Sequence, residues 1–167
     1  MMSFHKTLKK LKESQVFKDF KEKNKKAFLF SAFFVLTSEF SIETEQLDFY
    51  IPEKKKVETF FIDKEVKHKQ EDFTPKDKIT ALNEDIKTDL KELEEIIKKE
   101  LEKEKLTTYN INKIIVILQK QKEKQIWNIT CLLSGFKMLR IQVDCFNSEI
   151  LESKQGSILD FVQINSK

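Results

Sequence analysis

The chain has 167 residues, of which 40% are hydrophobic and 35% charged, so we expect one compact domain or two very small ones with a charged exterior. Backbone that cradles a phosphate needs glycine where it approaches the ligand closely, so the presence of only 2 glycines argues against a P-loop or a dinucleotide-binding fold. The net charge of +3 is mild and Arg140 is the only arginine, whereas specific readers of nucleic acid use arginine for bidentate contacts to bases.

Residues 1–27 are the most basic segment, with nine lysines, three acidic residues and a local charge of +6. Apolar residues at helical spacing predict an amphipathic helix over about residues 3–25. Its lysines are candidate anion-binding residues, although a solvated helix face is the simpler interpretation of such a run. These lysines are Lys9, Lys10, Lys12, Lys18, Lys21, Lys23, Lys25 and Lys26.

The next segment, residues 27–37, is apolar on both alternate sets of side chains, which predicts a strand inside a sheet with both faces covered, or a strand at an interface. One set is Phe28, Phe30, Ala32 and Phe34, and the other is Leu29, Phe33 and Val35. A helix needs about 20 apolar residues to cross a bilayer, so this shorter run predicts no transmembrane span.

Two further strands are predicted at residues 47–52 and 57–66, on either side of a lysine-rich turn, with Pro52 closing the first. The densest acidic cluster without lysine lies just before and within the first of them: Glu39, Glu43, Glu45 and Asp48. Their spacing does not match a calcium-binding loop, so we interpret them as surface residues and predict no metal site.

Residues 67–78 are polar and predict a connector that ends in a helix start, with Thr74 as the N-cap and Pro75 at the first helical position. Isoleucine and leucine then step by three or four residues and predict a helix that runs to about Lys105. About thirty helical residues span roughly 45 Å, which is longer than a small sheet can cover. We therefore expect part of this helix to bend away or to pack on a partner, for example as a coiled coil, with packing on its own sheet as the simpler alternative.

The second half predicts a β-branched strand at residues 113–121 and a hairpin at residues 126–144, with Gly135 at a turn position suited to positive φ. One face of the hairpin is apolar and includes Trp127 and Cys131. Cys131 and Cys145 lack CxxC spacing, and no secretion signal precedes them, so we expect reduced thiols and a cytoplasmic protein. The tail, residues 157–166, fits either a short strand or a helix.

The two halves share one pattern, because residues 47–63 align with residues 127–144 at an offset of about 80 residues. This repeat predicts an α+β fold that consists of a duplicated helix-βββ unit, with helices packed on one face of an antiparallel sheet. The first repeat would span residues 1–72 and the second residues 73–167, together forming one compact domain.

Residues 84–151 resemble a PepSY-type module, in which a helix precedes strands with a "W-x-[IV]-x" and a "[LV]-x-[IV]-x-V-D-x-x-x-G-x-[IV]" pattern. The matching residues are Trp127, Ile129, Leu139, Ile141, Val143, Asp144, Glu149 and Ile150. The first half repeats the pattern through Leu47, Phe49, Phe61, Ile62 and Asp63, with Leu47 in place of the tryptophan. The resemblance implies a cystatin-like α+β module that binds peptides or proteins, regulates peptidases and is not itself catalytic.

Catalysis is not expected, because His5 and His68 are isolated and no nucleophile lies beside a base in the sequence. We predict a non-catalytic module without a cofactor that binds a protein or peptide, or a second copy of itself, by its sheet face or a sheet edge. The candidate contacts are aromatic, because such anchors dominate interfaces, although a buried core position is the simpler interpretation. They are Phe28, Phe30, Tyr50 and Trp127. The alternative function is lysine-dependent binding of nucleic acid or an anionic membrane surface.

Overall fold

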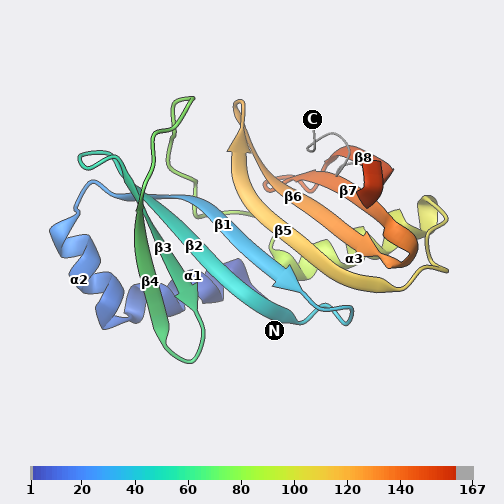
Figure 1. Cartoon of the computed structure of the whole chain (residues 1–167), viewed down its shortest axis with the longest axis horizontal. Helices are drawn as coiled ribbons and strands as arrows, with labels where there is room; N and C mark the ends of the chain where they lie inside the picture. Colours follow the sequence, from blue (N-terminus) through green and yellow to red (C-terminus); the bar gives the residue numbers. More distant parts are fainter. Residues whose placement is uncertain (1, 161–167) are drawn as a thin grey trace.

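Eight strands form one antiparallel sheet in the order β4-β3-β2-β1-β5-β6-β7-β8 in the computed structural model, which describes residues 2–160 (Figure 1). The strands are β1 (Phe28–Leu36), β2 (Ile42–Ile51), β3 (Lys56–Ile62), β4 (Val66–Asp72), β5 (Ile111–Gln121), β6 (Lys124–Leu133), β7 (Lys137–Asp144) and β8 (Ile150–Ser157). The helices are α1 (Phe4–Glu13), α2 (Gln15–Lys23) and α3 (Leu90–Lys103), with a short 3-10 turn, η1 (Ser134–Phe136). Each half of the chain contributes four consecutive strands, and the order is mirrored about the central β1–β5 pair.

The predicted α+β fold with a duplicated helix-βββ unit is wrong, because a single sheet dominates, with 44% of residues 2–160 in strands and 25% in helices. Each half has a fourth strand, β4 or β8, at an outer edge of the sheet. Residues 66–72 and 150–157 are largely polar. An edge strand tolerates polar residues, because it pairs with a neighbouring strand on one side only. Alternating hydrophobicity therefore could not reveal these two strands.

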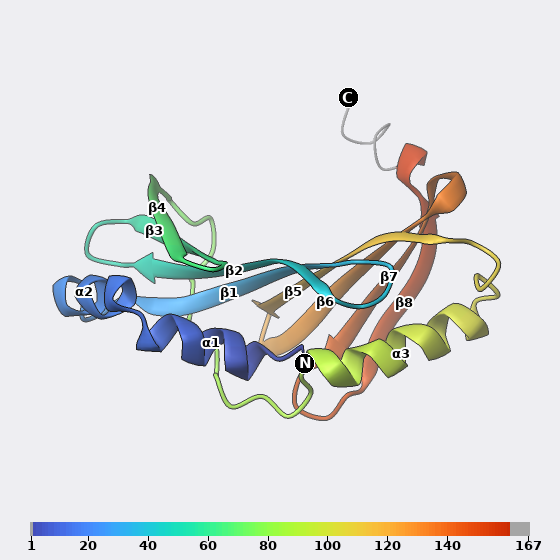
Figure 2. The ribbon, with the colours of Figure 1, turned by 90° about the horizontal axis from the view of Figure 1, so that it is seen from below.

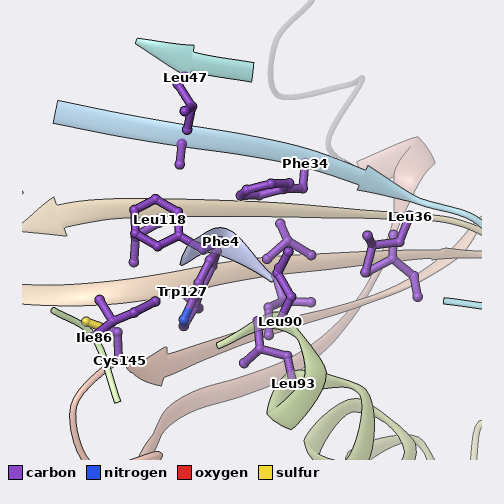
Figure 3. Packing of buried hydrophobic residues seen from close by; sticks show 14 of the residues in the cluster. Phe4, Phe34, Leu36, Leu47, Ile86, Leu90, Leu93, Leu118, Trp127 and Cys145 are labelled. Atoms are coloured by element: carbon purple, nitrogen blue, oxygen red, sulfur yellow. The ribbon is translucent and has the colours of Figure 1, made fainter. Parts of the chain in front are cut away.

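The three helices lie along one face of the sheet, which we call the helix face (Figure 2). Aromatic rings fill the contact between α2 and the first half, where Phe17 lies 5.1 Å from Phe49 and Phe20 lies 5.1 Å from Phe60, between ring centroids. In the second half, buried side chains of β6 and β7 face the same way, and Trp127 lies among Phe4 and Phe34 (Figure 3). The core thus fills the space between the helices and this face of the sheet.

The helix predicted over residues 3–25 is two helices, α1 and α2, that meet at Ser14. Ser14 adopts an extended conformation, with φ −73° and ψ 145°, and its hydroxyl accepts a hydrogen bond from the amide of Phe17. Serine is a favoured N-cap because its side chain satisfies an amide that the first helical turn leaves without a partner. Ser14 therefore ends one helix and begins the next, which lets the chain follow the twisted sheet.

The second predicted helix begins at Leu90 rather than after Thr74, and it ends at Lys103. Asp89 is its N-cap and forms a capping box with Glu92, a signal that the sequence contains at residues 89–92. The helix has 14 residues, about 21 Å of length, and so fits over its own sheet. The length of this helix therefore gives no support for a partner or a coiled coil.

Residues 73–89 form an irregular connector, which we call the strap, between the first half of the sheet and α3. The buried side chain of Gln125 holds it at Asn83, accepting from the amide at 2.8 Å and donating to the carbonyl at 2.9 Å. The amide of Leu82 also donates to the carbonyl of Leu29 at 2.8 Å. Leu82 and Ile86 are buried, so the apolar spacing that predicted a helix here instead serves a core-lining connector.

Three smaller expectations can be checked in the described residues. Gly135 has φ 68° in η1, which confirms the predicted positive φ. The predicted tail at residues 157–166 is described only as far as residue 160, where residues 158–160 are helical, and its remainder lies outside the described residues. Within residues 2–160, no helix is both long and apolar enough to cross a membrane.

Both cysteines, Cys131 and Cys145, are free thiols with 0% exposure, and burial raises the pKa of each to about 12. Because the thiolate is the reactive form, we expect the native protein to react negligibly with a disulfide reagent such as DTNB at neutral pH. Both thiols should react at once when denaturant unfolds the chain. Rapid labelling of a thiol in the native protein would contradict this burial.

Candidate functional site

The outer face of the sheet, opposite the helix face, has no element of the described residues packed on it (Figure 2). The central strands still carry apolar side chains there, since Phe33 lies opposite Ile117 and Val35 opposite Ile115. All four are only partly buried. Of the two predictions for residues 27–37, the one in which both faces are covered is therefore wrong, and a strand at an interface stays a prediction.

Four aromatic rings gather on the outer face near the start of β1, and we call Phe28, Phe30, Tyr50 and Phe73 the aromatic cluster. Ring centroids are 5.8 Å apart for Phe28 and Tyr50, 6.4 Å for Phe30 and Tyr50, and 5.9 Å for Phe30 and Phe73. Phe73, the first residue of the strap, is 36% exposed, and the other three rings are partly buried.

A β-bulge in β1 creates this arrangement. The register with β2 shifts between Leu29 and Ser31, so that Phe30 is the extra residue. The alternation of side chains along a regular strand predicts that Phe28 and Phe30 lie on the same face as Ala32 and Phe34. In the structure the bulge separates them, because Ala32 and Phe34 are fully buried whereas Phe28 and Phe30 contact Tyr50 on the outer face.

A groove of about 690 Å³ lies next to the aromatic cluster. Phe30, Ser31 and Gln119 line it, with Phe73 and residues 75–80 of the strap on one side and residues 120–122 of the β5–β6 hairpin on the other. It exists because the sheet splits here: pairing between β1 and β5 stops at Ser31 and Gln119, while β5 continues to Gln121. Figure 1 shows the strap and this hairpin projecting on either side of the split.

The groove has a positive rim. Lys76 and Lys78 belong to the strap and Lys120 and Lys122 to the hairpin, whereas Asp77 is the only acidic residue in the lining. All four lysines are exposed, and within residues 2–160 no ion pair engages them. Their charge is thus free to attract an anionic ligand.

Of the four aromatic contacts predicted from the sequence, the structure brings Phe28, Phe30 and Tyr50 together. Trp127 does not join them, because it has 0% exposure and its Nε1 donates to the carbonyl of Thr88 at 2.7 Å on the helix face. No partner can touch it in the folded protein. Sequence reasoning missed Phe73, for which the only signal was a single aromatic residue in a polar connector.

The eight candidate lysines of α1, α2 and the turn after them spread over that surface, and several are engaged locally. Lys12 pairs with Glu84, Lys26 with Glu53 at 3.6 Å and Lys9 with Glu13 at 4.0 Å. Lys10 donates to the carbonyl of Asp63 at 2.6 Å, and Lys21 donates to the carbonyls of Lys25 and Ala27. Lys18, Lys23 and Lys25 have exposed side chains. These contacts offset part of the basic charge of this surface.

The acidic residues of the first half do not converge on one site. Glu43 pairs with Lys113 at 3.2 Å, while Glu45 accepts from the hydroxyl of Thr7 on the helix face. Asp48 accepts from Thr59 at 2.7 Å on the outer face. Burial raises the pKa of Asp48, and its hydrogen bonds oppose that rise. No group of three or more histidine, cysteine or acidic side chains in residues 2–160 is placed to hold a metal ion.

Each histidine contacts a carboxylate. His5 lies 2.9 Å from Asp89, and His68 lies 3.5 Å from Glu58 while its ring stacks on Phe60. The hydroxyl of Ser3 also donates to Asp89, at 3.0 Å. A catalytic triad needs the histidine between the hydroxyl and the carboxylate, whereas here both groups bond the carboxylate directly. This arrangement caps the beginnings of α1 and α3.

Comparison with known proteins supports the fold only. No family model matches the chain, and no curated protein matches it. A solved structure from Clostridium difficile 630, described as a "putative lipoprotein", is similar with a TM-score of 0.57 and 17% sequence identity, over 84% of this chain and 90% of that chain. The resemblance to PepSY-type modules finds no support in these comparisons, and the α+β description is replaced by the single sheet. A cytoplasmic location stays a prediction.

Proposed function

We propose that the chain is a non-catalytic module that binds a protein or peptide through the aromatic cluster and the adjoining groove. The observation that carries this proposal is the gathering of four aromatic rings on an uncovered sheet face beside a groove of about 690 Å³. Aromatic side chains in partly enclosed pockets supply most of the binding energy at protein interfaces.

The alternative, lysine-dependent binding of nucleic acid or an anionic membrane surface through α1 and α2, has less support. Five of its eight lysines already have an acidic or carbonyl partner. A second copy of this chain remains one form that the protein partner can take. Light scattering coupled to size-exclusion chromatography tests whether two copies of the chain associate. An association through an apolar interface survives high salt, whereas one that depends on lysine charge does not.

The proposal is tested by selecting binders from a displayed library of random peptides against the full chain. The selected peptides should bind a Phe30→Ser/Tyr50→Ser double variant at least about tenfold more weakly, because two aromatic anchors are lost. Leu132→Ser is the matched control, since Leu132 is also a partly buried apolar residue of the outer face but belongs to β6. Fluorescence anisotropy measures the affinities, and circular dichroism verifies that each variant folds.

Affinity that falls only in the double variant supports the site. Equal binding by the wild type and the double variant contradicts it, as does a selection that yields no binder. An equal loss in the Leu132 control also contradicts it, because binding would then depend on the outer face as a whole rather than on the aromatic cluster.

A further inference from the structure

The split in the sheet leaves two residues of β5, Lys120 and Gln121, without a partner strand on the β1 side. Pairing with β1 ends at Gln119, but pairing with β6 on the other side continues to Gln121, which lies opposite Lys124. The end of β5 therefore stays extended, with one side bonded to β6. Its other side borders the groove and pairs with no strand of residues 2–160. An unpaired strand edge of this kind is a template for another extended chain.

The β1 side of the split is not equivalent. The carbonyl of Leu29 already accepts the amide of Leu82, so the strap uses the backbone edge of β1. A segment that enters the groove thus meets the free edge of β5 on one side and the strap and the aromatic cluster on the other. Side chains that alternate along an extended segment would reach both.

The charge of the groove selects the kind of segment. Lys120 and Lys122 lie at the end of the free edge, and Lys76 and Lys78 are on the strap that lines the same groove, with Asp77 as the single acid in the lining. Complementary charge steers binding and excludes like-charged partners. Acidic side chains on the incoming segment satisfy these lysines, whereas basic ones are repelled.

A peptide fits these features better than a nucleic acid does. Binding of single strands relies on ring faces on which bases stack. In the aromatic cluster Tyr50 packs edge to face against its three neighbours, with planes at 69° for Phe28, 79° for Phe30 and 74° for Phe73, whereas the planes of Phe30 and Phe73 differ by 32°. Arg140, the only arginine, is on β7 and is not part of the groove lining.

We infer that the groove takes an extended acidic segment of a partner protein, which adds as a short strand to β5 at Lys120 and Gln121. Its acidic side chains meet the four lysines of the rim, and its apolar side chains contact the aromatic cluster. This inference rests on the proposed peptide-binding function and adds to it both the charge of the partner and the backbone that receives it.

The charge is tested with a fluorescein-labelled peptide of alternating glutamate and valine, and a lysine–valine peptide as its counterpart. A Lys120→Glu/Lys122→Glu variant should bind the acidic probe about tenfold more weakly, because two attractive contacts become repulsive. Lys18→Glu/Lys23→Glu is the matched control, since it makes the same charge change on exposed residues of α2 and should alter affinity less than about twofold. Equal losses in the two variants, no loss in either, or preference for the basic probe would each overturn the inference.

The backbone contact is tested on the ligand, so that the folding of the protein is not at issue. Two versions of the acidic probe carry N-methyl groups on opposite alternate sets of amides. A segment that adds to β5 presents one set to the strand edge, so one version should lose binding while the other keeps it. Loss of binding by both versions to the same extent, or by neither, shows that the main chain does not dock on the edge.

These outcomes separate the inference from the proposed function. If selected peptides depend on Phe30 and Tyr50 but are neutral or basic, the inference fails and the proposed function stands. If no peptide depends on the aromatic cluster, both fail. If a single-stranded oligonucleotide binds the groove more tightly than the acidic peptide and is weakened by the Lys120→Glu/Lys122→Glu variant, the ligand is a nucleic acid and the inference is overturned.

Discussion

Replacing Trp127 with alanine should lower the free energy of unfolding by about 3–5 kcal/mol, the range typical of a large aromatic residue removed from a core. Trp127 has 0% exposure and lies 6.3 Å from Phe4 and 6.1 Å from Phe34, between ring centroids. Those partners come from α1 and β1, in the first half of the chain, whereas Trp127 is on β6. The cavity would therefore open where the two halves join.

Trp127→Phe is the informative control, because it keeps most of the ring and removes the hydrogen bond to the carbonyl of Thr88. That carbonyl would be left buried without a donor, which costs about 1–3 kcal/mol. Urea unfolding followed by far-ultraviolet circular dichroism measures both variants, since the only tryptophan is gone. A loss below about 1 kcal/mol for the alanine variant would contradict the buried position of this residue.

Replacing Asp89 with alanine should cost about 2–4 kcal/mol, because one carboxylate caps the beginnings of two helices. Its Oδ1 accepts from the amides of Leu90 in α3 and Phe4 in α1, both at 2.6 Å. Its Oδ2 accepts from the hydroxyl of Ser3 at 3.0 Å and lies 2.9 Å from Nδ1 of His5. Figure 2 shows the start of α1 beside the start of α3.

Asp89→Asn separates hydrogen bonding from charge. Asparagine keeps one acceptor oxygen but loses the negative charge that favours both helix N-termini. Asp89→Asn should therefore lower the free energy of unfolding by about a third to a half as much as Asp89→Ala does. Denaturant unfolding again provides the free energies. Equal stability of the alanine variant and the wild type would show that the two helices do not share this cap.

Strong, local signals made part of this fold predictable. The alternating apolar residues of β6 and β7 and the glycine between them specify a hairpin, and the structure contains it with Gly135 at positive φ. The sequence also contains the signal for the start of α3, which is Asp89 followed three residues later by Glu92. The Thr74–Pro75 pair upstream is a similar signal, and it favoured an earlier helix start. Apolar spacing through Leu82 and Ile86 then favoured the earlier start, because a core-lining connector buries residues as a helix does.

The candidate site depends on features that no short sequence pattern encodes. The bulge at Phe30 turns two phenylalanines away from the core, and only the register with β2 reveals it. The groove results from the end of β1–β5 pairing, which brings residues 73–80 beside residues 119–122. Lysines separated by more than forty positions thereby meet across one opening, whereas the sequence drew attention to the denser lysine run of the first helices.

Hydrogen–deuterium exchange of the full chain, with and without a selected peptide, tests the central claim most directly. Binding in the groove predicts slower exchange of backbone amides in residues 119–122 and 73–80, because docking on the β5 edge and against the strap protects them from solvent. The amides of α1 and α2 should not change. Protection confined to those two helices would contradict the proposed site and favour the lysine-dependent surface instead.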